Sequence, residues 1–348
     1  MGKLVSATEV ITKPIVTVLM PVYNGEYFLQ NALNSIFNQK FRNLELLVIN
    51  DASTDGTNSI LLNQTDKRLR ILNNPRNIGV AASLNRGLKE AHSKYIARMD
   101  ADDISLPNRL MLQVEYLESH PSTALIGGNY RLIDESDSLI SKPAYNHSMA
   151  GPELAWRLLW KNCIAHPTVL FRRQAVLAAG CYPENSPHSE DYGLWLRLSR
   201  TMRLATSKKV VLYLRKHKTN ITTIHAEQSE KNALSSSVAS IRSFLDIEPK
   251  NTLLEQLRFP GKSESNTELK LAAIHYLNEV AKKFLENSIE NLEEKNLRQA
   301  IAEQFLSLSH TWRDNPVLTS LSQQYSIKYN PCITLNIFFD RIQKKLFN

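Results

Sequence analysis

The sequence predicts an α/β protein with a mostly parallel β-sheet flanked by helices, followed by an all-helical C-terminal region. Three observations support this fold class. Apolar runs alternate with helical patterns near the start, polar side chains follow each apolar run, and helical periodicity alone continues after residue 225. Because 348 residues exceed one typical domain, we expect a catalytic domain over residues 1–225 and a helical domain over residues 226–348.

Four strands are expected before residue 100, with a helix between each strand and the next. The first apolar run, residues 15–20, is continuous and rich in β-branched side chains, which is typical of a strand buried on both faces. The other strands are expected at residues 44–49, 69–72 and 95–99, with helices at 28–37, around 60–62 and at 79–92. Units of this kind form a parallel sheet with right-handed crossovers.

Polar groups follow these four strands at the points where the strands end. They are Tyr23-Asn24, Asn50-Asp51, Arg76-Asn77 and Asp100 to Asp103. Since parallel sheets bind ligands beyond the carboxyl ends of their strands, we expect all four groups at one edge. The first strand is followed by Tyr23-Asn24-Gly25 and by no G-x-G-x-x-G, which argues against a nicotinamide dehydrogenase. The lack of a glycine- and lysine-rich triphosphate loop there also argues against a nucleotidyltransferase.

The segment Asp100-Ala101-Asp102-Asp103 places three carboxylates directly after an apolar strand. Repulsion and desolvation penalise such a cluster unless a cation or an exposed edge compensates it. One explanation is a divalent metal held by oxygen ligands, which in turn holds phosphate. The other is a helix N-terminus, where Asp is favoured by unpaired amides and by the helix dipole. The convergence of polar groups at the sheet edge favours the metal site.

The pattern changes after Asp103. We expect a helix from about 106 to 120, strands at 123–128, 130–133 and 139–141, a helix at 151–162 and a strand at 166–173. Ser189-Glu190-Asp191 then opens a helix, where a carboxylate is stabilised and a capping role is the simplest explanation. A further strand, 210–214, ends in Arg215, Lys216 and His217.

Charge and cysteine usage limit the partners and the compartment. The first 225 residues hold 27 Lys and Arg against 19 Asp and Glu, whereas the remainder balances 15 against 15. The excess of basic residues in this N-terminal part suits phosphate-bearing ligands or an anionic membrane surface. Nothing in the sequence indicates a nucleic-acid partner. Three cysteines without C-x-x-C spacing, and the lack of a signal peptide or long apolar span, predict a cytoplasmic protein.

Helical patterns at residues 229–246, 268–287 and 290–308 fill the C-terminal region, and residues 258–266 are expected to be a linker. At the end of the chain, Leu335, Phe338, Phe339, Ile342 and Leu346 line one helical face, with basic residues on another. Such a stripe suits peripheral contact with the cytoplasmic face of an anionic membrane. More often such a stripe packs on its own domain or on a second subunit of an oligomer.

Four segments resemble successive motifs of the family-2 glycosyltransferases. They are VTVLMPVYNG at 16–25, LLVINDASTDGT at 46–57, NIGVAASLNRGL at 77–88 and YIARMDADD at 95–103. The resemblance implies the GT-A fold, with a nucleotide-sugar half at about 14–105 and an acceptor half at about 106–225. It also implies inverting transfer of a hexose or N-acetylhexosamine from a UDP-sugar to a hydroxyl of a glycan or lipid-linked glycan, giving a β-linkage.

The resemblance further implies roles for individual residues on the donor side. Asp51 would bind uridine, because a carboxylate accepts hydrogen bonds from the uracil imide or the ribose; capping the turn before Ser53 is its alternative role. Tyr23 would pack against the base, with a core aromatic at a strand end as the alternative. The other donor positions implied are Pro21, Glu26, Arg76, Asp100 and Ala101.

The remaining implied roles concern the metal and the acceptor. Asp102 matches the metal ligand of the family's D-x-D, Asp103 is a helper, and His217 would be a further ligand of Mn²⁺ or Mg²⁺. Asp191 would be the catalytic base and Glu190 would contact the acceptor or orient the site. His166 would lie beside the acceptor, and Arg215, Lys216 or Lys218 would neutralise the diphosphate. A non-catalytic UDP-binding scaffold subunit is the alternative function, which the presence of all these acids disfavours.

Overall fold

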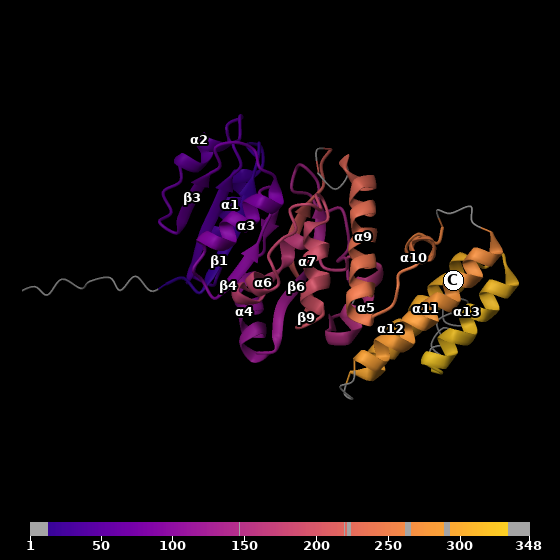
Figure 1. Ribbon diagram of the computed structural model, residues 1–348. Helices are drawn as coiled ribbons and strands as arrows, with labels where there is room; N and C mark the ends of the chain where they lie inside the picture. The colour runs from indigo at the N-terminus through magenta and orange to yellow at the C-terminus, as the bar shows by residue number, and fades with distance from the viewer. Residues whose placement is uncertain are drawn as a thin grey trace, which may run out of the picture.

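The computed structural model describes residues 13–145, 147–218, 220, 224–261, 266–288 and 293–332. A nine-stranded mixed sheet with helices on both faces makes up its N-terminal part, to the left of the C-terminal helices in Figure 1. Its first half confirms the predicted parallel sheet. Strands β1 (Val16–Val22), β2 (Leu44–Asn50), β3 (Leu69–Asn73) and β4 (Tyr95–Arg98) lie in the order β3-β2-β1-β4, all parallel. Helices α1 (Leu29–Phe37), α2 (Thr57–Leu62) and α3 (Val80–Glu90) connect them.

The second half of the sheet is mixed. Beyond β4 follow β8 (Leu170–Arg172), β6 (Thr123–Ile133), β9 (Arg203–Arg215) and β5 (Ile104–Ser105), while β7 (Met149–Ala150) pairs with β9. Strand β8 is antiparallel to both β4 and β6, whereas β6 and β9 are parallel. The short β5 and β7 were not predicted, because two-residue strands exist only through their pairing with β9.

Three local predictions for this half are wrong. One strand, β6, replaces the two expected at 123–128 and 130–133, since its pairing with β9 continues through shifts of register around Gly127, Asn129 and Tyr130. Residues 139–141 form no strand; a single bridge joins Ile133 to Leu139. His166 lies in a 3₁₀ turn, η1 (His166–Thr168), because the strand begins only at Leu170.

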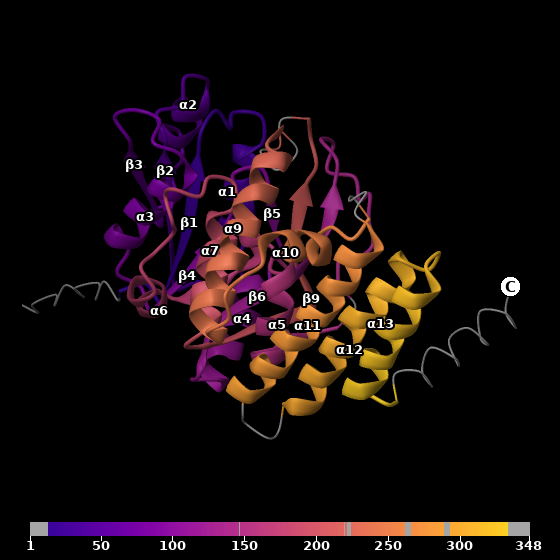
Figure 2. The ribbon, with the colours of Figure 1, turned by 45° about the vertical axis from the view of Figure 1, so that its right-hand side comes forward.

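Helices complete the fold, and Figure 2 shows those of residues 267–329 side by side. Those between the strands are α4 (Arg109–Ser119), α5 (Gly151–Trp160), α6 (Arg173–Ala178) and α7 (Glu190–Ser199). The C-terminal ones are α9 (Ala226–Leu245), α10 (Asn251–Arg258), α11 (Thr267–Asn287), α12 (Glu294–Thr311) and α13 (Pro316–Tyr329). Helices α10 and α13 were not predicted. The apolar stripe at 335–346 lies outside the described residues.

Two apolar cores lie on the two faces of the sheet. The smaller contains alternate side chains of β1 and β2 with α1 and α4, as in Val18, Leu46 and Leu33. The larger extends from Leu19 through Trp156 and Trp195 to Tyr329, so α5 and α7 share it with the C-terminal helices. Among the described helices, none is both long and apolar enough to cross a membrane.

Candidate active site

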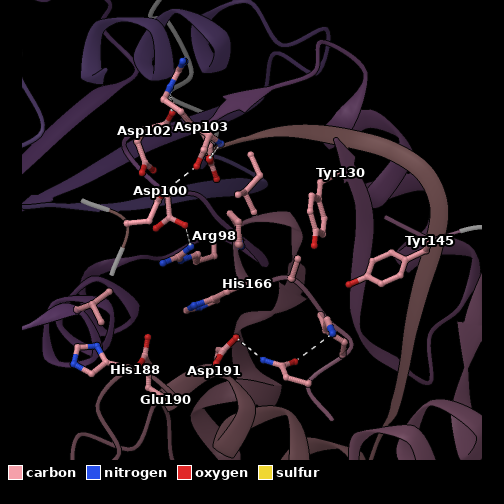
Figure 3. A pocket seen from close by; sticks show the side chains of 18 residues that line it. Arg98, Asp100, Asp102, Asp103, Tyr130, Tyr145, His166, His188, Glu190 and Asp191 are labelled. Atoms are coloured by element: carbon pink, nitrogen blue, oxygen red, sulfur yellow. Dashed lines mark hydrogen bonds and ion pairs between the residues drawn. The ribbon is translucent and has the colours of Figure 1, made fainter. Parts of the chain in front are cut away.

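A cavity of about 360 Å³ opens at the carboxyl ends of the strands, and most of the predicted acids line it (Figure 3). Asp100, Asp102 and Asp103 come from the loop after β4, and Glu190 and Asp191 from the first turn of α7. Acids nearly ninety residues apart in the sequence therefore share one cavity. Tyr130 and Tyr145 lie on the side of the cavity away from Glu190 and His188 (Figure 3), and Ile164 and Leu214 also line it.

The three aspartates after β4 lie close enough to hold one cation. One carboxylate oxygen from each of Asp100, Asp102 and Asp103 lies within 4.8 Å of the others. Burial and the charges of its two neighbours raise the pKa of Asp103 well above its usual value, and its Oδ2 has no hydrogen-bond partner among the described residues. Three carboxylates this close together, one of them with an unpaired buried oxygen, offer the oxygen ligands that a hard divalent ion prefers. These residues therefore fit a metal.

His217 joins this cluster from the loop after β9. Its Nε2 lies 2.8 Å from Oδ2 of Asp102, and its ring lies 5.2 Å from that of Phe28. Arg215, by contrast, is not free to bind a diphosphate. Its buried guanidinium pairs with Asp137, donates to the carbonyl of Asp102 at 2.8 Å, and lies over the ring of Phe28. The exposed Lys216 and Lys218 remain candidates.

Two buried arginines stabilise the acidic end of the cavity. Arg98, at the end of β4, pairs with Asp100. Its charge opposes the effect of burial, which raises the pKa of Asp100, Glu190 and Asp191. Arg109 donates to the carbonyls of Arg98 and Val169 at 2.7 and 3.2 Å, and burial lowers its pKa to about 9.

Asp191 and Glu190 differ in how they are held. Asn162 donates to Oδ2 of Asp191 at 2.9 Å, and the amide of Tyr192 donates to its Oδ1 at 2.6 Å. Glu190 is 6% exposed, and its Oε2 has no partner among the described residues. Burial, followed by the charge of Asp191, raises the pKa of Glu190 to about 7. Asp191 is thus the oriented carboxylate of the pair.

His166 lines the cavity as a neutral side chain. Burial, followed by the charge of Arg98, lowers its pKa well below the usual value. Its Nε2 lies 3.0 Å from the hydroxyl of Tyr182, and its ring meets Trp195 edge-on. Asn85 of α3 holds the backbone of Tyr182 through two hydrogen bonds of 2.9 Å.

Asp51 sits at the expected sheet edge but makes contacts that were not predicted. Its carboxylate accepts from Nδ2 of Asn74 at 2.6 Å and from the amides of Ile78 and Gly79 at 2.9 Å. The turn before Ser53 is instead capped by Asn50, whose Oδ1 accepts from the Ser53 amide at 3.1 Å. Asp51 therefore ties the loop after β3 to the end of β2.

The other donor-side residues lie on the same edge, outside the walls of the cavity. Pro21 pairs with Ile49 inside β1, and Ala101 lies against Gly25 in the turn that follows. Glu26 accepts from the amide of Gly56 at 2.7 Å, so it caps α2.

Two further donor-side residues present their side chains to solvent. Tyr23 is 51% exposed, which is inconsistent with the alternative that it is a core aromatic at a strand end. Arg76 is exposed on its loop.

Several cavity residues were not predicted from the sequence. They are Arg98, Tyr130, Tyr145, Asn162 and His188. Arg98 carried a usable signal, because a charged residue inside an apolar strand must be paired. The others lie on segments whose approach to the cavity depends on tertiary structure.

Comparison with known proteins defines the family. Residues 17–179 match the family described as Glycosyl transferase family 2. An uncharacterized glycosyltransferase of Haemophilus influenzae is 31% identical over 238 residues, which span 63% of this chain and 71% of that protein. The Escherichia coli UDP-Glc:alpha-D-GlcNAc-diphosphoundecaprenol beta-1,3-glucosyltransferase WfgD is 33% identical over 53% of this chain and 69% of its own length. The chain belongs to glycosyltransferase family 2 and is a glycosyltransferase.

Solved structures show the same fold. S. aureus TarS 1-349 in complex with UDP-GlcNAc has a TM-score of 0.58 at 16% identity, covering 93% of this chain and 92% of that one. The mannosyltransferase PcManGT from Pyrobaculum calidifontis, in complex with GDP-Man and Mn2+, has a TM-score of 0.52 at 18% identity, over 92% and 87%. The GT-A fold predicted from the sequence is thereby confirmed.

Proposed function

We propose that this glycosyltransferase moves a hexose or N-acetylhexosamine from a UDP-sugar to a hydroxyl of a glycan or lipid-linked glycan, with inversion. The observation that carries the proposal is that Asp191 and the Asp100–Asp103 cluster line one cavity. The choice of substrates is supported by two similar proteins: the name of WfgD includes a UDP-sugar and a lipid-linked acceptor, and TarS 1-349 is in complex with UDP-GlcNAc.

Asp191 is the proposed catalytic base. Asn162 and the Tyr192 amide fix its carboxylate, and burial raises its pKa, which makes it a stronger base than an exposed aspartate. As the acceptor oxygen attacks the anomeric carbon, Asp191 takes the hydroxyl proton while the bond to the UDP oxygen breaks. One in-line displacement inverts the anomeric centre, so an α-linked donor gives a β-linked product.

Asp102 and His217, with Asp100 and Asp103 beside them, are the residues proposed to hold Mn²⁺ or Mg²⁺. A bound divalent ion would act as a Lewis acid on the departing diphosphate. Uridine would lie at the edge formed by Pro21, Tyr23, Glu26 and Asp51, with Arg76 and Ala101 alongside. His166 would contact the acceptor, because its ring lines the cavity.

A UDP-release screen tests this proposal. The full chain is incubated with UDP-sugars, Mn²⁺ or Mg²⁺ and simple glycosides, and we expect release for at least one pair. Asp191→Asn should lower that release at least a hundredfold and leave UDP binding nearly unchanged, because it removes the base and little else. Asp314→Asn, exposed in the turn between α12 and α13, is the matched control. Substantial activity in Asp191→Asn would rule out the assigned base, and no release with any pair would favour a scaffold role.

A further inference from the structure

Three consecutive residues beside Asp191 carry polar atoms that the fold leaves unused. Nδ1 of His188, Oγ of Ser189 and Oε2 of Glu190 are buried and have no hydrogen-bond partner among the described residues. Ser189 and Glu190 are 2% and 6% exposed. Leaving such atoms unpaired destabilises a folded protein, so each requires an explanation, such as a ligand or ordered water.

The hydrogen bonds at the start of α7 do not give the Ser189 hydroxyl a partner. It is the N-cap residue of α7, where a serine hydroxyl normally accepts from an amide of the first turn. That bond is not made here, and the amide of Tyr192 donates to Oδ1 of Asp191 instead. The orientation of the base thus leaves the Ser189 hydroxyl without its usual partner.

His188 is held firmly in an unusual conformation. Its backbone φ of +63° is uncommon for a residue other than glycine, and such outliers concentrate at functional sites. Its ring stacks on that of His225 with centroids 4.0 Å apart and planes 3° apart. Ser229 of α9 donates to the His188 carbonyl at 2.8 Å. Helix α9 therefore fixes the ring position that leaves Nδ1 buried.

The ring of His188 and the carboxyl group of Glu190 both line the cavity that contains Asp191. His188, Glu190 and Asp191 line it together, and Figure 3 shows Glu190 next to Asp191, with His188 beyond it on the side away from Tyr130 and Tyr145. Burial, followed by the charge of His225, lowers the pKa of His188, so its imidazole is neutral at pH 7. A neutral imidazole and a carboxyl group, both unpaired, suit a hydroxyl that donates and accepts.

We infer that His188 and Glu190, which line the cavity beside Asp191, form a subsite for a second hydroxyl of the acceptor sugar, next to the one that Asp191 would deprotonate. The acceptor is then a saccharide that presents a vicinal diol to the first turn of α7. This inference rests on the proposed function, because it assumes that the acceptor hydroxyl reacts at Asp191. His225 acts through His188 and is a positioning residue.

Ring signals of histidine in the full chain, labelled with ¹⁵N, test the subsite without relying on turnover. The probes are the methyl glycosides of glucose, galactose and N-acetylglucosamine, added with UDP and Mn²⁺. At least one should shift the His188 signals and leave those of His275, which bonds to Tyr325 on the C-terminal helices, unchanged. If no glycoside moves the His188 signals, the unpaired atoms hold water only and the subsite is wrong.

Variants and deoxy sugars sharpen the test. Removing the hydroxyl next to the reacting one should weaken binding of the effective glycoside about tenfold in the wild type, which is typical of one lost hydrogen bond. His188→Asn, whose asparagine adopts positive φ readily, should abolish that difference. An equal tenfold effect in wild type and variant would overturn the inference.

UDP release with the same glycoside separates the two proposals. Shifted His188 signals without UDP release would support the hydroxyl-binding subsite and contradict the proposed reaction. UDP release with unshifted His188 signals would support the reaction and contradict the subsite.

Discussion

At the scale of a single residue, Arg98 interacts with both acidic groups of the site, the Asp100–Asp103 cluster and the Glu190–Asp191 pair. It pairs with Asp100 on one side, and its charge lowers the pKa of Glu190 and Asp191 on the other, against the effect of burial. Five carboxylates around one cavity would repel one another strongly if no cation lay among them. The buried guanidinium thus offsets the repulsion between the proposed base and the residues proposed to bind the metal.

Asp102 gives a prediction about the metal. Asp102→Ala should lower the affinity for UDP in the presence of Mn²⁺ at least tenfold and leave the metal-free affinity unchanged, because the cluster would lose a ligand that lies next to His217. Isothermal titration calorimetry with and without Mn²⁺ measures both values, with Asp314→Ala as control. Equal Mn²⁺ dependence in Asp102→Ala and the wild type would argue against the metal role.

Glu190 gives a prediction about stability and pH. Its folded pKa of about 7 lies above the usual value of 4.5, so the folded state binds the proton more tightly than the unfolded chain. Stability therefore falls as pH rises from about 4.5 to about 7. Glu190→Gln avoids this penalty and should be more stable than the wild type by on the order of 2 kcal/mol at pH 8, and by much less at pH 5.

Urea unfolding at the two pH values measures this difference. Glu268→Gln, on an exposed part of α11, serves as the control and should show no such dependence. A destabilised Glu190→Gln at pH 8 would contradict the prediction.

At the scale of single elements, β6 owes its shape to small residues that allow close packing against β9. A Cβ added to Gly128 would overlap the side chain of Val211 on the neighbouring strand, where the register of the pair shifts. Gly128→Ala should lower the free energy of unfolding by about 1–3 kcal/mol, as overpacked cores do.

Thermal and urea unfolding check the Gly128 prediction. A Cβ on Gly261 would meet no described atom within 4 Å, so Gly261→Ala is the matched control and should be nearly neutral. Equal stabilities of the two variants would show that β6 and β9 can separate without cost.

The elements also show what the sequence can predict. Strands β1, β2 and β4 are buried along nearly their whole length, so their apolar runs and the polar residues after them were sufficient to place Asp51 and Asp100 at one edge. The sequence could not show that Arg215 pairs with Asp137, or that Asn162 reaches Asp191, because those partners lie on distant segments. Backbone features such as the positive φ of His188 likewise depend on packing against α9.

For the molecule as a whole, the C-terminal helices and the catalytic sheet share one core. Phe284 of α11 lies edge-on to Trp156 of α5, with ring centroids 5.4 Å apart, and Arg157 pairs with Glu303 of α12 at 2.7 Å. The boundary predicted at residue 225 therefore does not separate two cores, because residues before and after it belong to the same apolar core. We propose that the two regions fold as one cooperative unit.

Phe284 tests that cooperativity. Phe284 is 1% exposed, and Phe284→Ala should destabilise the protein by about 3–5 kcal/mol. The loss should appear equally in fluorescence of the tryptophans and in circular dichroism, because one transition unfolds both regions. Two separate transitions, with the sheet unaffected, would show that the helices form an independent domain.

The three hydrogen bonds that Asp51 accepts have a consequence for the thermodynamics of nucleotide recognition. They order the loop from Asn74 to Gly79 when the chain folds, before any nucleotide arrives. The conformational entropy of that loop is then lost in folding, and a nucleotide bound at Asp51, as proposed above, would meet a preorganised surface. A loss of UDP affinity in an Asp51 variant would consequently combine a missing contact with a newly mobile loop. Only an accompanying measurement of amide exchange at Ile78 and Gly79 would separate the two.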